Sequence, residues 1–266
     1  MSTADIFHDL HAGPDILILA NAWDAGSARV IETLGARAIA TSSAAVCWAH
    51  GYADGHHLPV EFLTVSVREI TRVVSIPVSC DFEGGYSDDL PTVAENIAKV
   101  IDAGAVGINI EDGRDSPELL AAKIGVVREA ATKAGVNLFI NARTDVFLKG
   151  LAEPGEASVA EALRRGALYR DAGADGLFVP WVVEPDHIRT IATACGLPLN
   201  VIAKPGLASA AELAQLGVRR LSGGTGPARA ALYALKTAAT AFLATGDSDA
   251  LSAAGGDGGD YNKLFL

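Results

Sequence analysis

The chain has few basic residues, few aromatic residues and almost no cysteine or methionine. Its 266 residues include 21 Lys and Arg against 32 Asp and Glu, which gives a formal net charge of −11. Phosphate contacts require a basic face, and Lys and Arg form no cluster along the chain, so a nucleic-acid-binding function is not expected. The three cysteines have no CxxC spacing, which argues against a disulfide framework or a zinc site and favours a reducing compartment.

Long apolar segments are also missing. The most apolar short run, residues 16–20, is far shorter than the roughly 20 residues needed to span a bilayer. The first ten residues carry Asp5 and Asp9 and have no basic region. We therefore expect no membrane span, no secretory signal and a cytoplasmic location. The hydrophobic fraction of 50% indicates a large folded core instead, because disordered chains combine low hydrophobicity with high charge.

Short apolar segments alternate with longer, Ala-rich segments of helical period along most of the chain. The expected strands are 16–24, 38–43, 77–83, 106–112, 137–145, 176–180, 198–203 and 219–223. The expected helices are 25–34, 59–74, 91–103, 116–133, 158–172, 184–194, 208–216 and 227–245. Several helices end in a glycine where a left-handed C-cap residue is wanted, at Gly35, Gly104, Gly135, Gly173 and Gly217.

Eight such units predict an α/β fold, a (β/α)₈ TIM-type barrel in which helices cover a parallel sheet. An open doubly wound sheet is the alternative, and the lack of a GxGxxG motif after the first strand disfavours it. We expect one barrel domain over residues 1–246. Residues 247–259 are predicted to be a Gly/Ala/Asp-rich loop or linker, and the apolar end at 261–266 either docks, on its own barrel or on a partner chain, or is disordered.

Polar residues gather where four strands end, and barrel active sites form at the carboxyl ends of the strands. Strand alternation predicts three inward-facing groups and one polar strand end: Asp81 with Glu83; Asn109 with Glu111; Asn141 with Arg143 and Asp145; and Asn21-Ala22-Trp23-Asp24. Asp81, Glu83 and Glu111 would converge from neighbouring strands. Like carboxylates that lie close together and buried cannot all ionise cheaply.

A retained proton, a neutralising arginine or a divalent cation would each stabilise such a carboxylate cluster. Mg²⁺, with Mn²⁺ as an alternative, prefers oxygen ligands, and Arg143 could bind a carboxylate bidentately. A metal beside an arginine suits a small anionic carboxylate substrate, because the metal polarises a carbonyl or stabilises an enolate while the arginine positions a carboxylate. For any single pair, an ordinary strand-end ion pair is the alternative.

Other residues at this rim each allow two interpretations. Lys204 follows the seventh strand, with Asn200 on the same face, and is either a Schiff-base lysine or a surface lysine. Residues 221–226 form a Gly-rich turn that either binds phosphate or simply needs glycines. The loop after the second strand contains three histidines that are either solvated or include a proton donor: His50, His56 and His57.

At these residues the chain resembles the isocitrate lyase/phosphoenolpyruvate mutase superfamily, in particular its small phosphonomutase-like branch. The segments that carry the resemblance are Thr41-Ser42-Ser43-Ala44-Ala45, Gly51-Tyr52-Ala53-Asp54-Gly55, Asp81-Phe82-Glu83-Gly84-Gly85-Tyr86, Gly107-Ile108-Asn109-Ile110-Glu111-Asp112 and Asn141-Ala142-Arg143-Thr144-Asp145. The resemblance implies a (β/α)₈ barrel and Mg²⁺ dependence. It also implies formation or cleavage of C–C or P–C bonds next to a 2-oxo acid, through an enolpyruvate-type intermediate.

The resemblance further implies roles for individual residues. Asp81 would be a direct metal ligand, Glu83 and Glu111 would hold metal-bound waters, and Asp54 would be a catalytic acidic residue near the metal. The loop Ser43, Ala44 and Ala45 would bind the substrate carboxylate, and Arg143 would bind the substrate and take part in catalysis. Trp23 and Asn200 are added as substrate-binding candidates. The resemblance also implies exchange of the last helix between subunits, so a homo-oligomer is expected, either a dimer or a dimer of dimers (a homotetramer). The tail is the candidate for the swapped segment.

One departure from the superfamily bears on the reaction. Isocitrate and methylisocitrate lyases carry a Lys-Lys/Arg-Cys-Gly-His loop after the fourth strand, whereas residues 113–118 here read Gly-Arg-Asp-Ser-Pro-Glu. Protonating a departing carbanion needs a positioned acid, but decarboxylation of an oxaloacetate-like acid demands less because water could protonate the enolate.

The expected function is therefore a Mg²⁺-dependent lyase that cleaves or forms a C–C bond next to a 2-oxo or 2-hydroxy carboxylate. Three alternatives remain. The first is a P–C bond phosphonomutase or hydrolase acting on phosphonopyruvate-like substrates. The second is a non-catalytic barrel that binds a carboxylate, and the third is a Schiff-base aldolase that uses Lys204.

Overall fold

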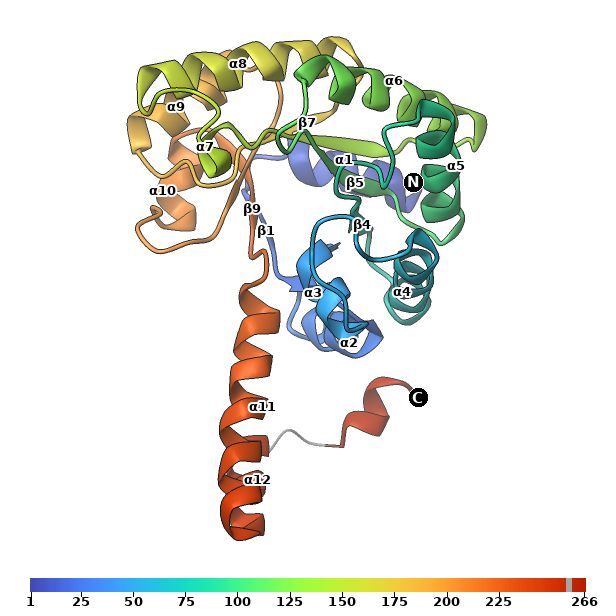
Figure 1. Ribbon diagram of the computed structural model, residues 1–266, viewed down its shortest axis with the longest axis vertical. Coiled ribbons are helices and arrows are strands. Elements are labelled where there is room, and N and C mark those ends of the chain that lie inside the picture. The colour runs from blue at the N-terminus through green and yellow to red at the C-terminus, as the bar shows by residue number, and fades with distance from the viewer. Residues whose placement is uncertain (257–259) are drawn as a thin grey trace.

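A nearly closed parallel sheet forms the centre of the computed structural model, which describes residues 1–256 and 260–266 (Figure 1). The strands are β1 (Leu17–Leu19), β2 (Asn21–Ala22), β3 (Ile39–Thr41), β4 (Val78–Asp81), β5 (Gly107–Glu111), β6 (Phe139–Arg143), β7 (Gly176–Phe178), β8 (Leu199–Ile202) and β9 (Val218–Ser222). They pair in the order β1-β9-β8-β7-β6-β5-β4-β3-β2. Because β1 and β2 are consecutive pieces of one extended segment, the two ends of this order meet and the sheet closes as a barrel.

Helices connect the strands and cover the outside of the sheet (Figure 1). They are α1 (Thr3–Ala12), α2 (Ala25–Thr33), α3 (Ser43–Ala49), α4 (Val60–Val73), α5 (Leu90–Asp102), α6 (Pro117–Lys133), α7 (Val146–Lys149), α8 (Glu156–Asp171), α9 (Pro185–Ala194), α10 (Ala210–Gln215), α11 (Gly226–Thr245), α12 (Ser248–Gly255) and the 3₁₀ helix η1 (Tyr261–Leu264). The predicted (β/α)₈ barrel is confirmed, and the open doubly wound alternative is wrong. The short helices α3 and α7 were expected to be loop or strand end.

Local sequence signals explain where several helices begin and end. Asp89, Ser116 and Ser209 each accept a hydrogen bond from the backbone N–H three residues later, at the start of α5, α6 and α10. The glycines predicted to end helices all have positive φ values: Gly35, Gly104, Gly135, Gly173 and Gly217. At Gly104 a side chain would also be crowded, because a Cβ atom there would lie 3.1 Å from Thr71. These glycines end their helices shortly before β3, β5, β6, β7 and β9 begin.

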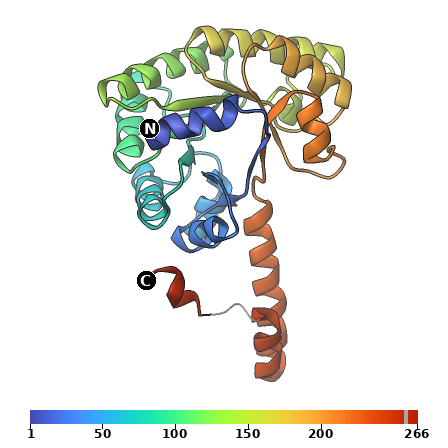
Figure 2. The same ribbon diagram turned by 180° about the vertical axis from the view of Figure 1, so that it is seen from behind.

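Helix α1 was not expected from the sequence, and it covers the amino-terminal end of the barrel (Figure 2). Phe7 is fully buried and its ring lies edge-on to Phe139, with 5.5 Å between the ring centroids. His11 stacks on the same ring at 4.0 Å, and its Nδ1 donates a hydrogen bond to the Phe7 carbonyl at 2.8 Å. A Cβ atom on Gly107 would lie 2.6 Å from the Phe7 ring, so the absence of a side chain there admits α1. This end of the barrel is thus filled, and the polar strand ends lie at the other.

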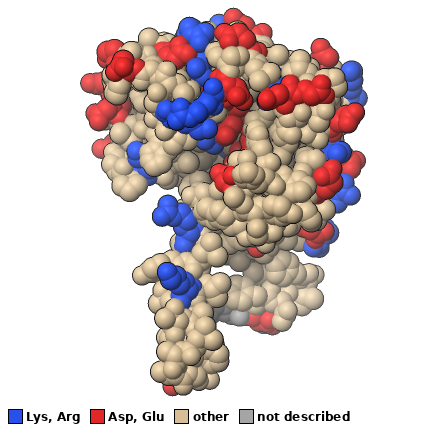
Figure 3. All heavy atoms as spheres, viewed as in Figure 1, with Lys and Arg blue, Asp and Glu red and all other residues tan. Residues whose placement is uncertain are grey.

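Helix α11 projects away from the barrel (Figures 1 and 2). It also carries an exposed apolar surface. Its first turn buries Ala228, whereas Leu232, Tyr233, Leu235 and Leu243 are between 49% and 83% exposed. Acidic and basic side chains are intermixed over the barrel in Figure 3, while the projecting helix carries few of either. Among residues 1–256 and 260–266, no helix has both the length and the apolar character that crossing a bilayer requires.

The segment after α11 differs from the expectation. A loop or linker was predicted over 247–259, but residues 248–255 form α12, because Asp247 caps the Asp249 N–H and an Ala- and Ser-rich segment follows. Residues 257–259 lie outside the described part of the chain. Beyond them, η1 reaches the same chain's α2, where Arg29 Nε donates a hydrogen bond to the Leu264 carbonyl at 2.7 Å.

Candidate active site

Acidic side chains lie at the carboxyl ends of β4 and β5, where the strand alternation predicted Asp81 and Glu111. The two strands are neighbours, and Asp81 pairs in register with Asn109, two residues before Glu111. Asp81 is 8% exposed and Glu83 3% exposed. Burial raises the pKa of Asp81, raises that of Glu83 to about 7 and raises that of Glu111 to about 8, and neighbouring carboxylates add to each effect. Burial therefore disfavours the ionised form of all three carboxylates.

The loop between β3 and α3 holds Asp81 in place. The Asp81 N–H donates a hydrogen bond to Thr41 Oγ1 at 2.8 Å, and Asp81 Oδ2 accepts one from the Ser43 N–H at 2.9 Å. Ser43, Ala44 and Ala45, the predicted substrate-binding loop, are buried and form the first turn of α3. The Ser43 N–H therefore faces the carboxylate cluster, and the binding of a substrate carboxylate by this turn stays a prediction.

The orientation of Glu83 has a different cause from the one predicted. The strand was expected to continue to residue 83, but β4 ends at Asp81, and Glu83 has a left-handed φ of 47°. Strand alternation therefore does not orient this side chain. Its carboxylate instead accepts hydrogen bonds from the His56 N–H and from the Tyr86 hydroxyl, the latter at 3.0 Å. Neither partner was expected from the sequence, although Tyr86 lies in a segment that carries the family resemblance and His56 directly follows another.

Asp54 and Cys47 complete a compact group with Glu83. One potential ligand atom from each lies within 4.8 Å of the others, and Asp54 is the exposed member. Burial, together with the charge of Glu83, raises the pKa of Cys47 to about 12, so this residue is a neutral thiol at pH 7. The donors that remain are carboxylate oxygens, which fit a hard cation such as Mg²⁺ and not a thiolate-bound metal.

Arg143 lies at the end of β6 between two carboxylates. Its Nε and Nη2 donate hydrogen bonds to the fully buried Asp145 at 2.7 and 3.2 Å, and its Nη1 lies 2.6 Å from Glu111 Oε2. Although burial opposes the charge, Glu111 and Asp145 raise the pKa of Arg143. The two-point contact with Asp145 fixes the plane of the guanidinium group. Nη1 is therefore the part of the guanidinium that faces the carboxylate cluster.

Asp112 stabilises this end of the barrel through buried hydrogen bonds. It is 1% exposed and accepts hydrogen bonds from the Asp145 N–H at 2.9 Å, from Arg165 Nη1 at 2.9 Å and from the Tyr169 hydroxyl at 2.7 Å. These bonds connect the ends of β5 and β6 to α8. Asp112 thus holds Asp145, and through it Arg143, in place.

Two predicted substrate-binding residues lie away from the carboxylates. Trp23 lines an apolar pocket of about 250 Å³ together with Trp48 and Leu232 of α11. Asn200 is buried inside the barrel, where its Oδ1 accepts a hydrogen bond from Ser222 Oγ at 3.2 Å. Both assignments stay predictions.

The two remaining rim features each have a structural partner. Lys204 Nζ lies 4.0 Å from the centre of the Trp181 ring, in a cation–π contact. In the Gly-rich turn at 221–226, the Gly224 N–H donates a hydrogen bond to Asn21 Oδ1 at 2.8 Å, so this donor is already used within the fold.

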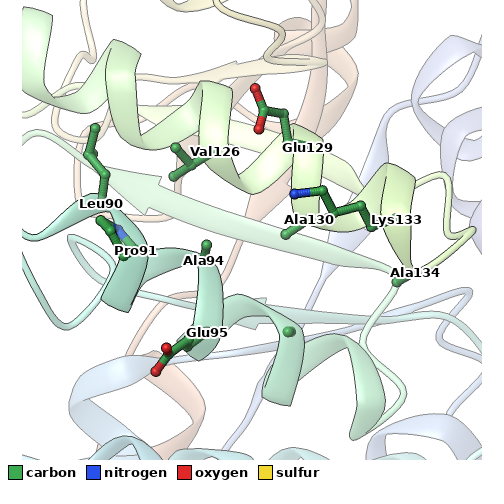
Figure 4. Close-up of a pocket in the computed structure, with 10 residues that line it drawn as sticks. Leu90, Pro91, Ala94, Glu95, Val126, Glu129, Ala130, Lys133 and Ala134 are labelled. Atoms are coloured by element: carbon green, nitrogen blue, oxygen red, sulfur yellow. The ribbon is translucent and has the colours of Figure 1, made fainter.

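Two cavities differ in their relation to the strand ends. A pocket of about 210 Å³ opens beside the cluster, and its lining includes His56, Glu83, Glu111 and Lys149. A groove of about 660 Å³ lies between α5 and α6 on the outside of the barrel, lined mainly by small and aliphatic side chains (Figure 4). Only the first of these cavities contacts the candidate catalytic groups.

Comparisons with known proteins agree with this geometry. Residues 7–243 match the family described as phosphoenolpyruvate phosphomutase. An uncharacterized protein of Mycobacterium tuberculosis (strain ATCC 25618 / H37Rv) is 36% identical over 239 residues, which is 88% of each chain. An oxaloacetate decarboxylase of Pseudomonas fluorescens (strain SBW25) is 30% identical over 241 residues, 86% of this chain and 80% of that protein. A solved structure from Burkholderia cenocepacia J2315, named as a phosphonomutase, is 42% identical with a TM-score of 0.84, covering 88% of this chain and 97% of that one.

Proposed function

Because the chain belongs to the phosphoenolpyruvate phosphomutase family, we propose that it is a Mg²⁺-dependent lyase of small 2-oxo or 2-hydroxy dicarboxylates. The family membership confirms the resemblance expected from the sequence, and with it the enzyme class, the isocitrate lyase/PEP mutase type. Within that class, the proposed reaction cleaves or forms a C–C bond next to the carboxylate-bearing 2-oxo or 2-hydroxy carbon. Decarboxylation of an oxaloacetate-like acid is the leading case.

The observation that carries this proposal is the buried carboxylate cluster beside Arg143. Asp81, Glu83 and Glu111 all have pKa values raised by burial, and Arg143 is shared between Glu111 and Asp145. The cluster therefore favours a hard divalent cation, which these three carboxylates would hold. When bound, Mg²⁺ would polarise the 2-oxo group and stabilise the negative charge that develops as the neighbouring bond breaks.

The chain's own residues would bind and orient the substrate. Arg143 Nη1 faces the cluster while Asp145 fixes the other edge of the guanidinium group, so Nη1 would bind a substrate carboxylate. The first turn of α3, at Ser43, Ala44 and Ala45, would bind the second end of the substrate through donors other than the Ser43 N–H, which already binds Asp81. Asp54 is exposed and close to Glu83, and it would exchange protons with solvent at the open side of the cluster.

Decarboxylation fits the loop after β5 better than cleavage of a larger acid. Residues 113–118 contain neither the Cys nor the His that could protonate a departing carbanion. A decarboxylation product can take its proton from water at the pocket beside Glu83 and Glu111. The 30% identity to an oxaloacetate decarboxylase over 86% of the chain supports the same choice.

The test is an assay of 2-oxo and 2-hydroxy diacids with Mg²⁺ that measures CO₂, pyruvate and glyoxylate. We expect CO₂ and pyruvate from oxaloacetate above the metal-only background, complete loss with EDTA and recovery on adding Mg²⁺. Asp81→Ala should be inactive, whereas the matched control Asp102→Ala, which removes an exposed carboxylate on α5, should keep full activity. Turnover that persists in EDTA, or full activity of Asp81→Ala, would refute the proposal.

A P–C bond mutase or hydrolase is the second candidate, and the 42% identity to a structure named as a phosphonomutase favours it. The same Arg143 and α3 groups could bind the carboxylate of a phosphonopyruvate-like substrate. Incubation with phosphonopyruvate and Mg²⁺, followed by ³¹P NMR, distinguishes the two. A new phosphate or phosphoenolpyruvate resonance would support P–C chemistry, and an unchanged spectrum would exclude it.

A further inference from the structure

Arg220 is a charged side chain inside the barrel, away from the proposed active site. It lies on β9, is 1% exposed, and donates a hydrogen bond from Nε to Ser222 Oγ at 3.0 Å. Its Nη1 and Nη2 have no hydrogen-bond partner among residues 1–256 and 260–266, and no carboxylate in those ranges lies within ion-pair distance. The buried Arg165 and the partly buried Arg143 differ, because each contacts two carboxylates.

The neighbours of Arg220 add further unpaired donors. Asn200 on β8 is its direct register partner, so the two side chains lie next to each other on the inside of the barrel. Asn200 Oδ1 accepts the hydrogen bond from Ser222 Oγ, and its Nδ2 has no partner in the described part of the chain. Ser79, two residues before Asp81 on β4, also has a buried hydroxyl with no hydrogen-bond partner among the described residues. This level of the barrel therefore presents a guanidinium group, an amide and a hydroxyl with nothing to receive their hydrogen bonds.

Buried donors of this kind destabilise the folded state if no ligand accepts their hydrogen bonds. A buried donor without a partner loses the hydrogen bonds that it made to water, and a buried charge without a counter-charge is more destabilising still. Burial lowers the pKa of Arg220 to about 10 although the charge of Asp81 opposes that effect, so the group is still charged at neutral pH. The charge of Arg220 also affects His11, because this charge and burial together lower the pKa of His11 to about 3.

Water could accept some of these hydrogen bonds, but it would not neutralise the charge. We propose that the barrel interior beneath the carboxylate cluster binds a halide-sized monoanion, held by Arg220 Nη1 and Nη2 and Asn200 Nδ2, with Ser79 Oγ on the opposite wall. The set consists of donors and carries a net positive charge, which is what an anion requires. Leu17, the register partner of Arg220 on its other side, is apolar and offers nothing to the further oxygens of a larger oxyanion.

A crystallographic experiment tests the occupant directly. Crystals of the wild-type protein grown with sodium bromide in place of sodium chloride should show an anomalous difference peak in contact with Arg220 and Asn200. Density at this position without anomalous signal, which would identify water, would overturn the proposal.

Solution measurements test the same site without crystals. The melting temperature of the wild type should rise as chloride or bromide replaces gluconate at constant ionic strength. Above the dissociation constant, the ratio of folded to unfolded protein should rise about tenfold for each tenfold increase in halide. A melting temperature that does not depend on the halide would also overturn the proposal.

Two variants and one control separate the site from general salt effects. Arg220→Met should abolish the halide response. Arg165→Met removes another buried arginine, which already has carboxylate partners, and should destabilise the protein but keep the response. If Arg220→Met does not fold, Asn200→Asp supplies an internal carboxylate beside Arg220, and we expect it to fold and to lose both the response and the bromide peak. A halide response that survives in either site variant would contradict the assignment.

Discussion

Metal binding at the carboxylate cluster should release protons, and the structure sets the size of this effect. Burial raises the pKa of Glu83 to about 7 and that of Glu111 to about 8, compared with an ordinary value of 4.5. Near neutral pH the metal-free cluster therefore keeps protons that a hard cation must displace, because oxygen ligands bind in their ionised form. The apparent affinity for Mg²⁺ should consequently increase with pH.

The magnitude follows from the two pKa values. Between pH 6 and pH 8, a group with a pKa of about 8 contributes roughly 50-fold to the affinity, and a group with a pKa of about 7 contributes roughly tenfold. Glu111 already pairs with Arg143, so we take the smaller figure as the minimum expected: a decrease of about tenfold in the apparent dissociation constant for Mg²⁺. In the metal-free protein, the pH dependence of folding stability has the opposite sign to that of the Mg²⁺ affinity. Between pH 4.5 and 8 the folded state holds protons that the unfolded chain has released, so stability falls as the pH rises.

Isothermal titration calorimetry at pH 6, 7 and 8, in two buffers of different ionisation enthalpy, measures both the affinity and the protons released. We expect proton release near pH 7 and the tightest binding at pH 8. Glu111→Gln should reduce the pH dependence, whereas the matched control Glu118→Gln, an exposed carboxylate on α6, should leave it unchanged. Binding that is independent of pH, with no proton release, would refute the reasoning.

Four further outcomes are expected. Because burial lowers the pKa of His11 to about 3, the wild type should lose about 2 kcal/mol more stability than His11→Phe between pH 7.5 and pH 5 in urea denaturation; equal losses would contradict this. Gly107→Ala would place a methyl group 2.6 Å from the Phe7 ring and should lower the free energy of unfolding by about 1–3 kcal/mol, and an unchanged value would count against the packing of α1. Arg143→Lys loses the two-point contact and should lower kcat/KM for the diacid substrate by roughly 100-fold, so wild-type kinetics would exclude its proposed role. We propose that the apolar surface of α11 joins subunits of a homo-oligomer; Leu235→Glu should then give monomers in light scattering after size exclusion, and an unchanged mass would argue against this surface.

The sequence by itself predicted the barrel fold and the positions of some residues at its candidate active site. The alternation of strands and helices, and the glycines that end the helices, are local patterns that repeat along the chain. They predicted the closed parallel sheet that the structure shows. Asp81, Glu111 and Arg143 were placed correctly at the strand ends because each lies within a regular strand, where alternation determines which side a residue faces.

Tertiary structure decided the features that depend on chain segments far apart in the sequence. Glu83 lies beyond the end of β4, so its direction depends on the loop that supplies His56 and not on strand alternation. Helix α1 has a place only once a closed barrel exists for it to cover, and Gly107 and Phe139 come from two different strands of that barrel. The unpaired state of Arg220 is likewise invisible in the sequence. A strand pattern shows that a side chain points inward, but only the closed sheet determines which groups meet it there.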